Sequence, residues 1–150
     1  MMIKIATKKE IEKSLSIAKE LNEWFTKEAV KNMKIDFFIN NLIVSKEKNE
    51  VLGFLCYNSY NGELKILWMG VRKNNQRKNI GKSIIDYLEK EAKKQKINEI
   101  QVETLPDEDK YEPYLLTRNF YYKNGFKRIA YLKAIKQGWD DQILLENKLK

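Results

Sequence analysis

The fold of this chain is decided by residues 63–92, E-L-K-I-L-W-M-G-V-R-K-N-N-Q-R-K-N-I-G-K-S-I-I-D-Y-L-E-K-E-A. The apolar run Leu64–Val71 predicts a buried strand, and from Ile80 onward apolar residues recur at helical spacing. Between them lies a polar, basic loop, residues 72–78. This order indicates an anion site, because a loop and the first turn of a helix present unpaired backbone N–H groups. No acidic residue occurs from Leu64 to Ile85, so the predicted ligand is a phosphate or pyrophosphate group.

Composition restricts the fold and the chemistry. A chain of 150 residues with 43% hydrophobic residues predicts a single domain, residues 1–150, with a substantial core. Its one cysteine, Cys56, cannot form an internal disulfide and is expected to be an inert core residue. Because there is no histidine, the usual zinc sites and Ser-His-Asp or Cys-His catalysis are excluded. Chemistry would have to use carboxylates, Tyr, Lys, Ser, Thr or backbone dipoles.

The charge and hydropathy patterns bear on partners and location. No apolar run approaches about 18 residues and the first ten residues lack a signal-peptide core, so a cytoplasmic protein without a membrane partner is expected. The net charge of +8 is typical of nucleic-acid-binding domains. However, the basic residues are interleaved with 21 acidic ones, so we expect no nucleic-acid partner. A monomer or a homodimer is expected.

The periodicity along the chain predicts an α/β fold in the order strand, two helices, three strands, helix, strand, helix, two strands. Thr7 and Glu10 have the spacing of a capping box before the first helix. Residues 35–39 are apolar but ambiguous. The expected ranges are 2–6, 8–24, 26–33, 42–46, 51–57, 64–71, 80–92, 99–105, 113–123, 126–135 and 142–149.

The crossover through the central helix predicts how the sheet is paired. Strand, helix, strand implies that residues 64–71 and 99–105 are parallel neighbours joined by a right-handed connection. The remaining strands are joined by turns and are expected to be antiparallel. The prediction is therefore a central mixed sheet of six or seven strands, flanked by helices, with a ligand loop at the carboxyl end of its central strand.

Two motifs resemble one family. Gln76-Arg-Lys-Asn-Ile-Gly81 resembles the Q/R-x-x-G-x-G/A loop by which the GNAT superfamily of N-acetyltransferases holds the pyrophosphate of acetyl-CoA. Asn79 stands where the first glycine is usual, and Asn tolerates a left-handed backbone better than other residues with a side chain. About 40 residues later, Phe120-Tyr121 followed by Gly125-Phe126 resembles the F-Y-x-x-x-G-F element of many members.

The resemblance implies a GNAT-like three-layer fold and a transferase that uses acetyl-CoA as acyl donor, with no metal. An amine would attack the thioester directly in a ternary complex, and Tyr121 would protonate the departing thiolate. The general base would be a carboxylate, for which Glu63 and Glu103 are the candidates. The residues implied in cofactor binding are Met69, Val71, Gln76, Arg77, Lys78, Asn79, Gly81, Lys82, Tyr114 and Thr117.

The acceptor is expected to be a primary amine of a small molecule or a peptide. The resemblance places Trp24 and Phe25 in one wall of the acceptor pocket. Two acidic loops suggest a cationic acceptor, because converging carboxylates would attract it and an aromatic ring would add a cation–π surface. The loop after Leu105 carries Asp107, Glu108, Asp109 and Glu112, and the loop between the last two strands carries Trp139, Asp140 and Asp141.

Two other functions fit parts of the same loop. Gln76 to Ser83 matches a Walker A phosphate loop that lacks its first glycine, which would make the chain a nucleotide-binding P-loop protein. A non-catalytic CoA-binding domain would keep the loop and need no function of Tyr121. The P-loop alternative requires a sheet with several parallel crossovers, whereas the sequence predicts one.

Overall fold

The computed structural model describes residues 1–150 as a seven-stranded sheet flanked by four helices. The strand order across the sheet is β1-β2-β3-β4-β5-β7-β6. The elements are β1 (Met2–Ile5), α1 (Lys8–Glu20), α2 (Lys27–Ile39), β2 (Asn41–Glu47), β3 (Glu50–Tyr60), β4 (Glu63–Val71), a 3₁₀ turn (Lys73–Asn75), α3 (Ile80–Lys94), β5 (Glu99–Thr104), α4 (Glu112–Lys123), β6 (Lys127–Leu132) and β7 (Gln142–Lys148).

The predicted mixed sheet is confirmed. β4 and β5 are the only parallel neighbours, and they pair over three positions, from Leu64↔Ile100 to Ile66↔Val102. Every other pair is antiparallel. Beyond Ile66 and Val102 no pairing continues, so the carboxyl ends of β4 and β5 separate. With one parallel pair the sheet is not that of a P-loop protein, and that alternative is wrong.

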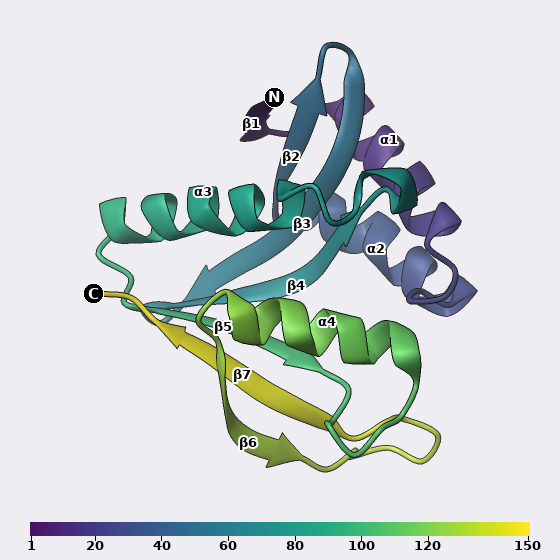
Figure 1. Ribbon diagram of the computed structural model, residues 1–150, viewed down its shortest axis with the longest axis vertical. Coiled ribbons are helices and arrows are strands. Elements are labelled where there is room, and N and C mark those ends of the chain that lie inside the picture. Colours follow the sequence, from purple (N-terminus) through teal and green to yellow (C-terminus); the bar gives the residue numbers. More distant parts are fainter.

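The helices form two outer layers, as predicted. Figure 1 shows α3 and α4 on the near face of the sheet, with α3 over the half that contains β2 to β4 and α4 over the half that contains β5 to β7. The helices α1 and α2 pack on the other face, where Ile17, Met33 and Phe37 belong to a separate buried cluster. None of the four helices has the length and hydrophobicity that a membrane-crossing segment needs.

Two predicted helix boundaries were wrong. The first helix ends at Glu20 rather than near Trp24, because Leu21 leaves helical geometry with ψ at 50°. The second helix continues to Ile39, so the ambiguous residues 35–39 are helical. Thr26 caps this second helix by accepting a hydrogen bond from the Ala29 N–H at 3.1 Å. Trp24 therefore lies in the turn between the two helices, residues 21–26, which we call the α1–α2 turn.

The predicted capping box of α1 is present and also joins this helix to the sheet. Glu10 is 5% exposed and accepts hydrogen bonds from Lys4 at 2.5 Å and from the Thr7 N–H at 3.0 Å. Lys46 on β2 lies 2.6 Å from its other oxygen. Burial alone would raise the pKa of this carboxyl, but the hydrogen bonds from the two lysines and Thr7 outweigh it and lower the pKa to about 2.

Candidate active site

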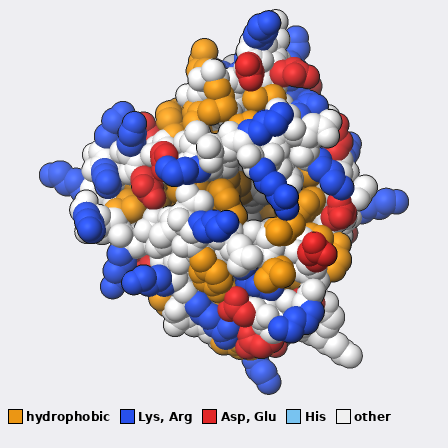
Figure 2. Space-filling model, in the orientation of Figure 1, with side chains coloured by type: hydrophobic (Ala, Val, Ile, Leu, Met, Phe, Trp, Pro, Cys, Tyr) orange, Lys and Arg blue, Asp and Glu red, His pale blue; other side chains and the backbone are white.

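A cavity of about 650 Å³ lies where β4 and β5 separate. Residues of the α1–α2 turn, the end of β4, the start of α3 and one face of α4 line it. Figure 2 shows the hollow near the centre of one face of the molecule, with Lys and Arg side chains around it. Arg77, Lys82 and Lys123 line the cavity, and no carboxylate does. A basic, partly apolar cavity of this size suits an anionic ligand with an apolar arm.

The loop before α3 presents its backbone to this cavity. Arg77 and Asn79 both have φ of 63°, so both adopt the left-handed conformation, and Asn79 is the N-cap of α3 without a side-chain cap. The six backbone N–H groups of residues 77–82 donate no hydrogen bond within the protein; the first that does is Ser83, to Asn79. Successive free N–H groups at a helix start are a ready anion site, so these residues fit a pyrophosphate.

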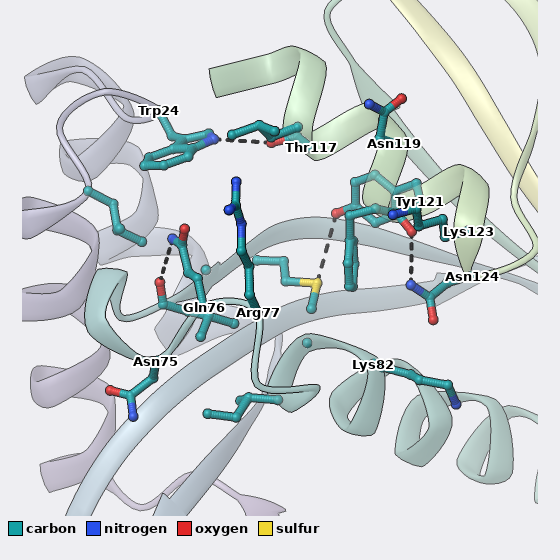
Figure 3. Close-up of a pocket in the computed structure, with 18 of the residues that line it drawn as sticks. Trp24, Asn75, Gln76, Arg77, Lys82, Thr117, Asn119, Tyr121, Lys123 and Asn124 are labelled. Atoms are coloured by element: carbon teal, nitrogen blue, oxygen red, sulfur yellow. Dashed lines mark hydrogen bonds between the residues drawn. The ribbon is translucent and has the colours of Figure 1, made fainter. Parts of the chain in front are cut away.

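The basic side chains of the loop are not equivalent. Arg77 has no ion-pair partner and extends between Trp24 and Tyr121 (Figure 3). Lys82 is already paired with Asp86 at 2.9 Å. Lys78 does not line the cavity, so its predicted contribution is limited to its free N–H. Arg77 is therefore the cation best placed for an anionic ligand.

Two other predicted loop residues, Gln76 and Gly81, also have structural roles. The side-chain amide of Gln76 donates to the Val71 carbonyl at 3.0 Å, which folds the loop back onto β4. A Cβ added to Gly81 would lie 2.9 Å from a ring carbon of Phe120 on α4. Glycine is therefore needed at position 81 for the close approach of α3 and α4, a reason that the loop motif alone does not give.

The end of β4 carries Met69 and Val71, two of the residues that the resemblance implies in cofactor binding. The N–H of Arg72 donates to Leu52 on β3 at 2.9 Å. Because successive N–H groups of a strand point to opposite sides, those of Met69 and Val71 point away from β3, toward the side where β5 has separated. Both residues line the cavity.

Tyr121 is 5% exposed and lines the cavity from α4. Its hydroxyl has one weak contact, to the Met69 sulfur at 4.0 Å, which Figure 3 shows as a dashed line. Burial raises the pKa of this hydroxyl, and the neighbouring Tyr114 adds to the shift, so Tyr121 keeps its proton at neutral pH. The cavity thus contains a protonated donor with no strong partner.

Of the two predicted cofactor contacts on α4, Thr117 lines the cavity and Tyr114 does not. The Tyr114 hydroxyl donates to the Trp24 carbonyl at 2.5 Å. Thr117 accepts from the Trp24 indole N–H at 3.1 Å. Trp24 and Phe25, which were predicted for the wall of an acceptor pocket, also line the cavity. Phe25 packs edge-on against Trp68 with ring centroids 6.0 Å apart.

The two predicted bases lie outside the cavity. Glu63 is exposed at the first residue of β4, at the opposite end of the strand from Met69. Glu103 on β5 forms an ion pair with Lys65. Neither carboxylate lines the cavity.

The acidic loops are mostly engaged in contacts of their own. Four of their six carboxylates have a hydrogen-bond or ion-pair partner. The other two, Glu112 and Asp140, have none. Trp139 is 58% exposed, does not line the cavity, and has the Lys136 ammonium 4.8 Å from its ring centroid. The engaged carboxylates are Asp107 (Arg118, Tyr122, Arg128), Glu108 (Arg128), Asp109 (Tyr111 N–H) and Asp141 (Tyr131, Ala134 N–H).

Sequence reasoning missed three polar residues that line the cavity, Asn119 and Lys123 on α4 and its C-cap residue Asn124. Helical spacing from Tyr121 contains a signal for one of them, because Asn124 at i+3 shares its face. Asn119 and Lys123, two residues before and after Tyr121, have no such signal. They reach the cavity only because of how α4 is set against α3.

Comparisons with known proteins agree with this geometry. A family model described as "Acetyltransferase (GNAT) domain" matches residues 39–128, more than half of the chain. No curated protein sequence is significantly similar to the chain.

Solved structures share the fold at low sequence identity. A structure assigned to the GNAT acetyltransferases from Desulfovibrio desulfuricans has a TM-score of 0.84 and 18% identity, covering 99% of each chain. The ribosomal-protein-S18-alanine N-acetyltransferase of Escherichia coli has a TM-score of 0.78 and 12% identity, covering 99% of this chain and 94% of the other. The aminoglycoside 6′-N-acetyltransferase of Enterococcus faecium has a TM-score of 0.73 and 16% identity, covering 99% and 97%.

Because those structures are named for different acceptors, the shared fold leaves the acceptor open. The separated parallel pair, the loop with free N–H groups and the matching family model identify the chain: it belongs to the GNAT family of N-acetyltransferases, which use acetyl-CoA to acetylate amine acceptors.

Proposed function

We propose that residues 1–150 act as one domain that transfers the acetyl group of acetyl-CoA to a primary amine by direct attack in a ternary complex. The observation that carries this proposal is the cavity itself. It combines free backbone N–H groups and an unpaired Arg77 at one end with a protonated Tyr121 beside the separated strands, and it contains no carboxylate. The free N–H groups of residues 77–82 and the Arg77 guanidinium bind the pyrophosphate.

Each step of the transfer has a group of this chain assigned to it. The acceptor ammonium first loses a proton to water, because no carboxylate lines the cavity. The neutral nitrogen then forms a bond to the thioester carbonyl carbon, and the N–H groups of Met69 and Val71 stabilise the resulting oxyanion. When the C–S bond breaks, the Tyr121 hydroxyl donates its proton to the leaving sulfur. The nitrogen, which became positively charged on attack, loses a proton to water, and water returns a proton to the Tyr121 oxygen. The products are the acetylated amine and the CoA thiol.

A finer part of the proposal is that the acceptor carries positive charge beyond the reacting amine. Two exposed carboxylates without partners support it, Glu112 and Asp140. The negative charge of Asp140 contributes to the raised pKa of Tyr114, after burial and Tyr111, and the Tyr114 hydroxyl donates to the Trp24 carbonyl in the α1–α2 turn. Electrostatic attraction at this rim would raise the local concentration of a cationic amine.

The experiment is a Tyr121→Phe substitution, assayed by acetyl-CoA-dependent thiol release over a panel of cationic, neutral and anionic amines. The ring and its packing against Phe126 remain, and only the hydroxyl is lost. Because general acid catalysis contributes about 10²–10⁴-fold, kcat is expected to fall on that scale while CoA affinity by calorimetry changes less than about twofold. A variant with the kcat of the parent would reject Tyr121 as the acid. If none of the amines in the panel supports thiol release by the parent protein, the transferase proposal is rejected.

A further inference from the structure

The N-terminal half of α4 is fastened to the α1–α2 turn by a set of hydrogen bonds that we call the Trp24 clamp. Two tyrosine hydroxyls donate to carbonyls of the turn, Tyr111 to Glu23 at 2.7 Å and Tyr114 to Trp24 at 2.5 Å. In the other direction, the Trp24 indole N–H donates to the Pro113 carbonyl at 3.0 Å and to the Thr117 hydroxyl at 3.1 Å. The members of the clamp are Glu23, Trp24, Tyr111, Pro113, Tyr114 and Thr117.

These hydrogen bonds orient the Trp24 side chain, which also packs against the buried cluster beneath α1 and α2. Trp24 borders the main cavity and also a second cavity of about 410 Å³. Figure 3 shows the indole above Arg77, with its nitrogen turned toward Thr117. A residue that borders two cavities has fewer packing neighbours on those sides, so its hydrogen bonds contribute to its orientation.

The clamp lies on the face of α4 that carries the proposed acid. Tyr114, Thr117 and Tyr121 are spaced i, i+3 and i+7, which places them on one side of the helix. Tyr121 has no hydrogen bond stronger than the 4.0 Å contact to Met69, so the position of its hydroxyl follows the position of α4. Burial, followed by the charges of Tyr111 and Asp140, raises the pKa of Tyr114 to about 12, so this hydroxyl remains a donor through neutral pH.

We infer that Tyr114 and Trp24 are positioning residues for the transfer step, holding α4 so that the Tyr121 hydroxyl meets the leaving sulfur. This inference rests on the proposed acid role of Tyr121. The N–H groups proposed to bind the cosubstrate belong to a different element, the loop before α3, and Tyr114 does not line the cavity. Loss of the Tyr114 hydrogen bond should therefore impair the chemical step and leave cosubstrate binding intact. A displacement of about 1 Å in a reacting group costs up to about 10²-fold in rate, which sets the scale.

The test is a double-mutant cycle of Tyr114→Phe and Tyr121→Phe, measured as kcat for thiol release with the most active amine. Tyr114→Phe removes one hydroxyl and keeps the ring. Its matched control is Tyr60→Phe, at a tyrosine that is 85% exposed and makes no hydrogen bond. A Trp24→Phe variant removes the indole N–H and tests the other direction of the clamp. Acetyl-CoA affinity by calorimetry and the melting temperature are measured for each variant.

The expected result is that Tyr114→Phe and Trp24→Phe each lower kcat about tenfold. For Tyr114→Phe, whose side chain does not line the cavity, acetyl-CoA affinity should change less than about twofold. In the Tyr121→Phe background, Tyr114→Phe should lower kcat by less than about twofold, because a residue that acts by placing the hydroxyl has no effect once the hydroxyl is gone. Effects that multiply would overturn the positioning role and leave Tyr121 as the acid. Parental kcat for Tyr114→Phe would also overturn it, whereas parental kcat for Tyr121→Phe alone would reject the acid and the inference together.

Discussion

Substitution of Gly81 by alanine tests whether this glycine serves helix packing or ligand approach. The added Cβ would lie 2.9 and 3.0 Å from two ring carbons of Phe120; the first distance is shorter than Cβ atoms normally show and the second is a tight contact. Either the ring or α4 has to move by a few tenths of an ångström, and such overpacking costs about 1–3 kcal/mol. Alanine regains up to about 1 kcal/mol of helix propensity in α3.

The net expected loss is therefore about 1 kcal/mol, measured as the free energy of unfolding in urea. For a chain of this length it corresponds to a fall in melting temperature of roughly 2–4 °C. The compensating variant is Phe120→Leu, which removes the two ring carbons that the new methyl would contact. In that background Gly81→Ala should be neutral or slightly stabilising.

Additive effects of the two substitutions would refute this explanation. If together they lower the free energy of unfolding by the sum of their separate effects, within about 0.5 kcal/mol, the contact with Phe120 is not the reason why position 81 requires glycine. The same proteins report on the ligand through CoA affinity. If affinity recovers in the double variant, packing is the reason for glycine. If affinity stays low while stability recovers, the cosubstrate itself requires the close approach.

Three further substitutions separate the roles of charged residues. Arg77→Gln should weaken CoA binding about tenfold by calorimetry, whereas the matched Lys78→Gln should change it less than about threefold. The reason is that, of these two residues, only Arg77 lines the cavity. Equal effects would mean that the overall charge alone attracts the ligand. Glu10→Gln should lower the free energy of unfolding at pH 7 by about 1–2 kcal/mol. Because the folded pKa of Glu10, about 2, lies below the usual 4.5, its contribution is complete above about pH 4.5 and is lost as the pH falls toward 2. If the parent and the variant lose stability equally between about pH 4.5 and pH 2, this prediction is contradicted. Asp140→Asn should raise KM for cationic amines a few-fold with little change in melting temperature. Asp141→Asn removes a carboxylate that is hydrogen-bonded to Tyr131 and Ala134, so it should lower the melting temperature. The reverse outcome would exclude attraction of a cationic amine by Asp140.

How far the site could be predicted differs from residue to residue. Asn79 and Gly81 were expected at the start of α3 from the loop motif, and both line the cavity. Tyr121 was expected on the last helix and lies buried beside Met69. Glu103 was expected near the reacting centre, but it pairs with Lys65 across the parallel strands. A motif places a residue on an element, whereas the partner of a charged side chain depends on which elements become neighbours.

The sequence by itself determined the elements and their order. Strand, basic loop and helix in residues 63–92 follow from hydrophobic periodicity, and the crossover they form implies the parallel pair. These features depend on residues within a few positions of one another, which is why pattern alone predicts them. The end of α1 at Glu20 escaped prediction because Leu21 and Phe25 continue the helical spacing of apolar residues, although Leu21 leaves helical geometry.

Only the tertiary structure decided what surrounds the cavity. The Trp24 clamp joins residues 88 to 93 positions apart, and the contact of Gly81 with Phe120 joins two helices that are separate in sequence. The same holds for Tyr114, which binds the α1–α2 turn although its position in the motif suggested the cosubstrate. Such contacts form when the sheet brings distant helices together, and periodicity, which records only which face of an element is buried, carries no information about which side chain will lie opposite.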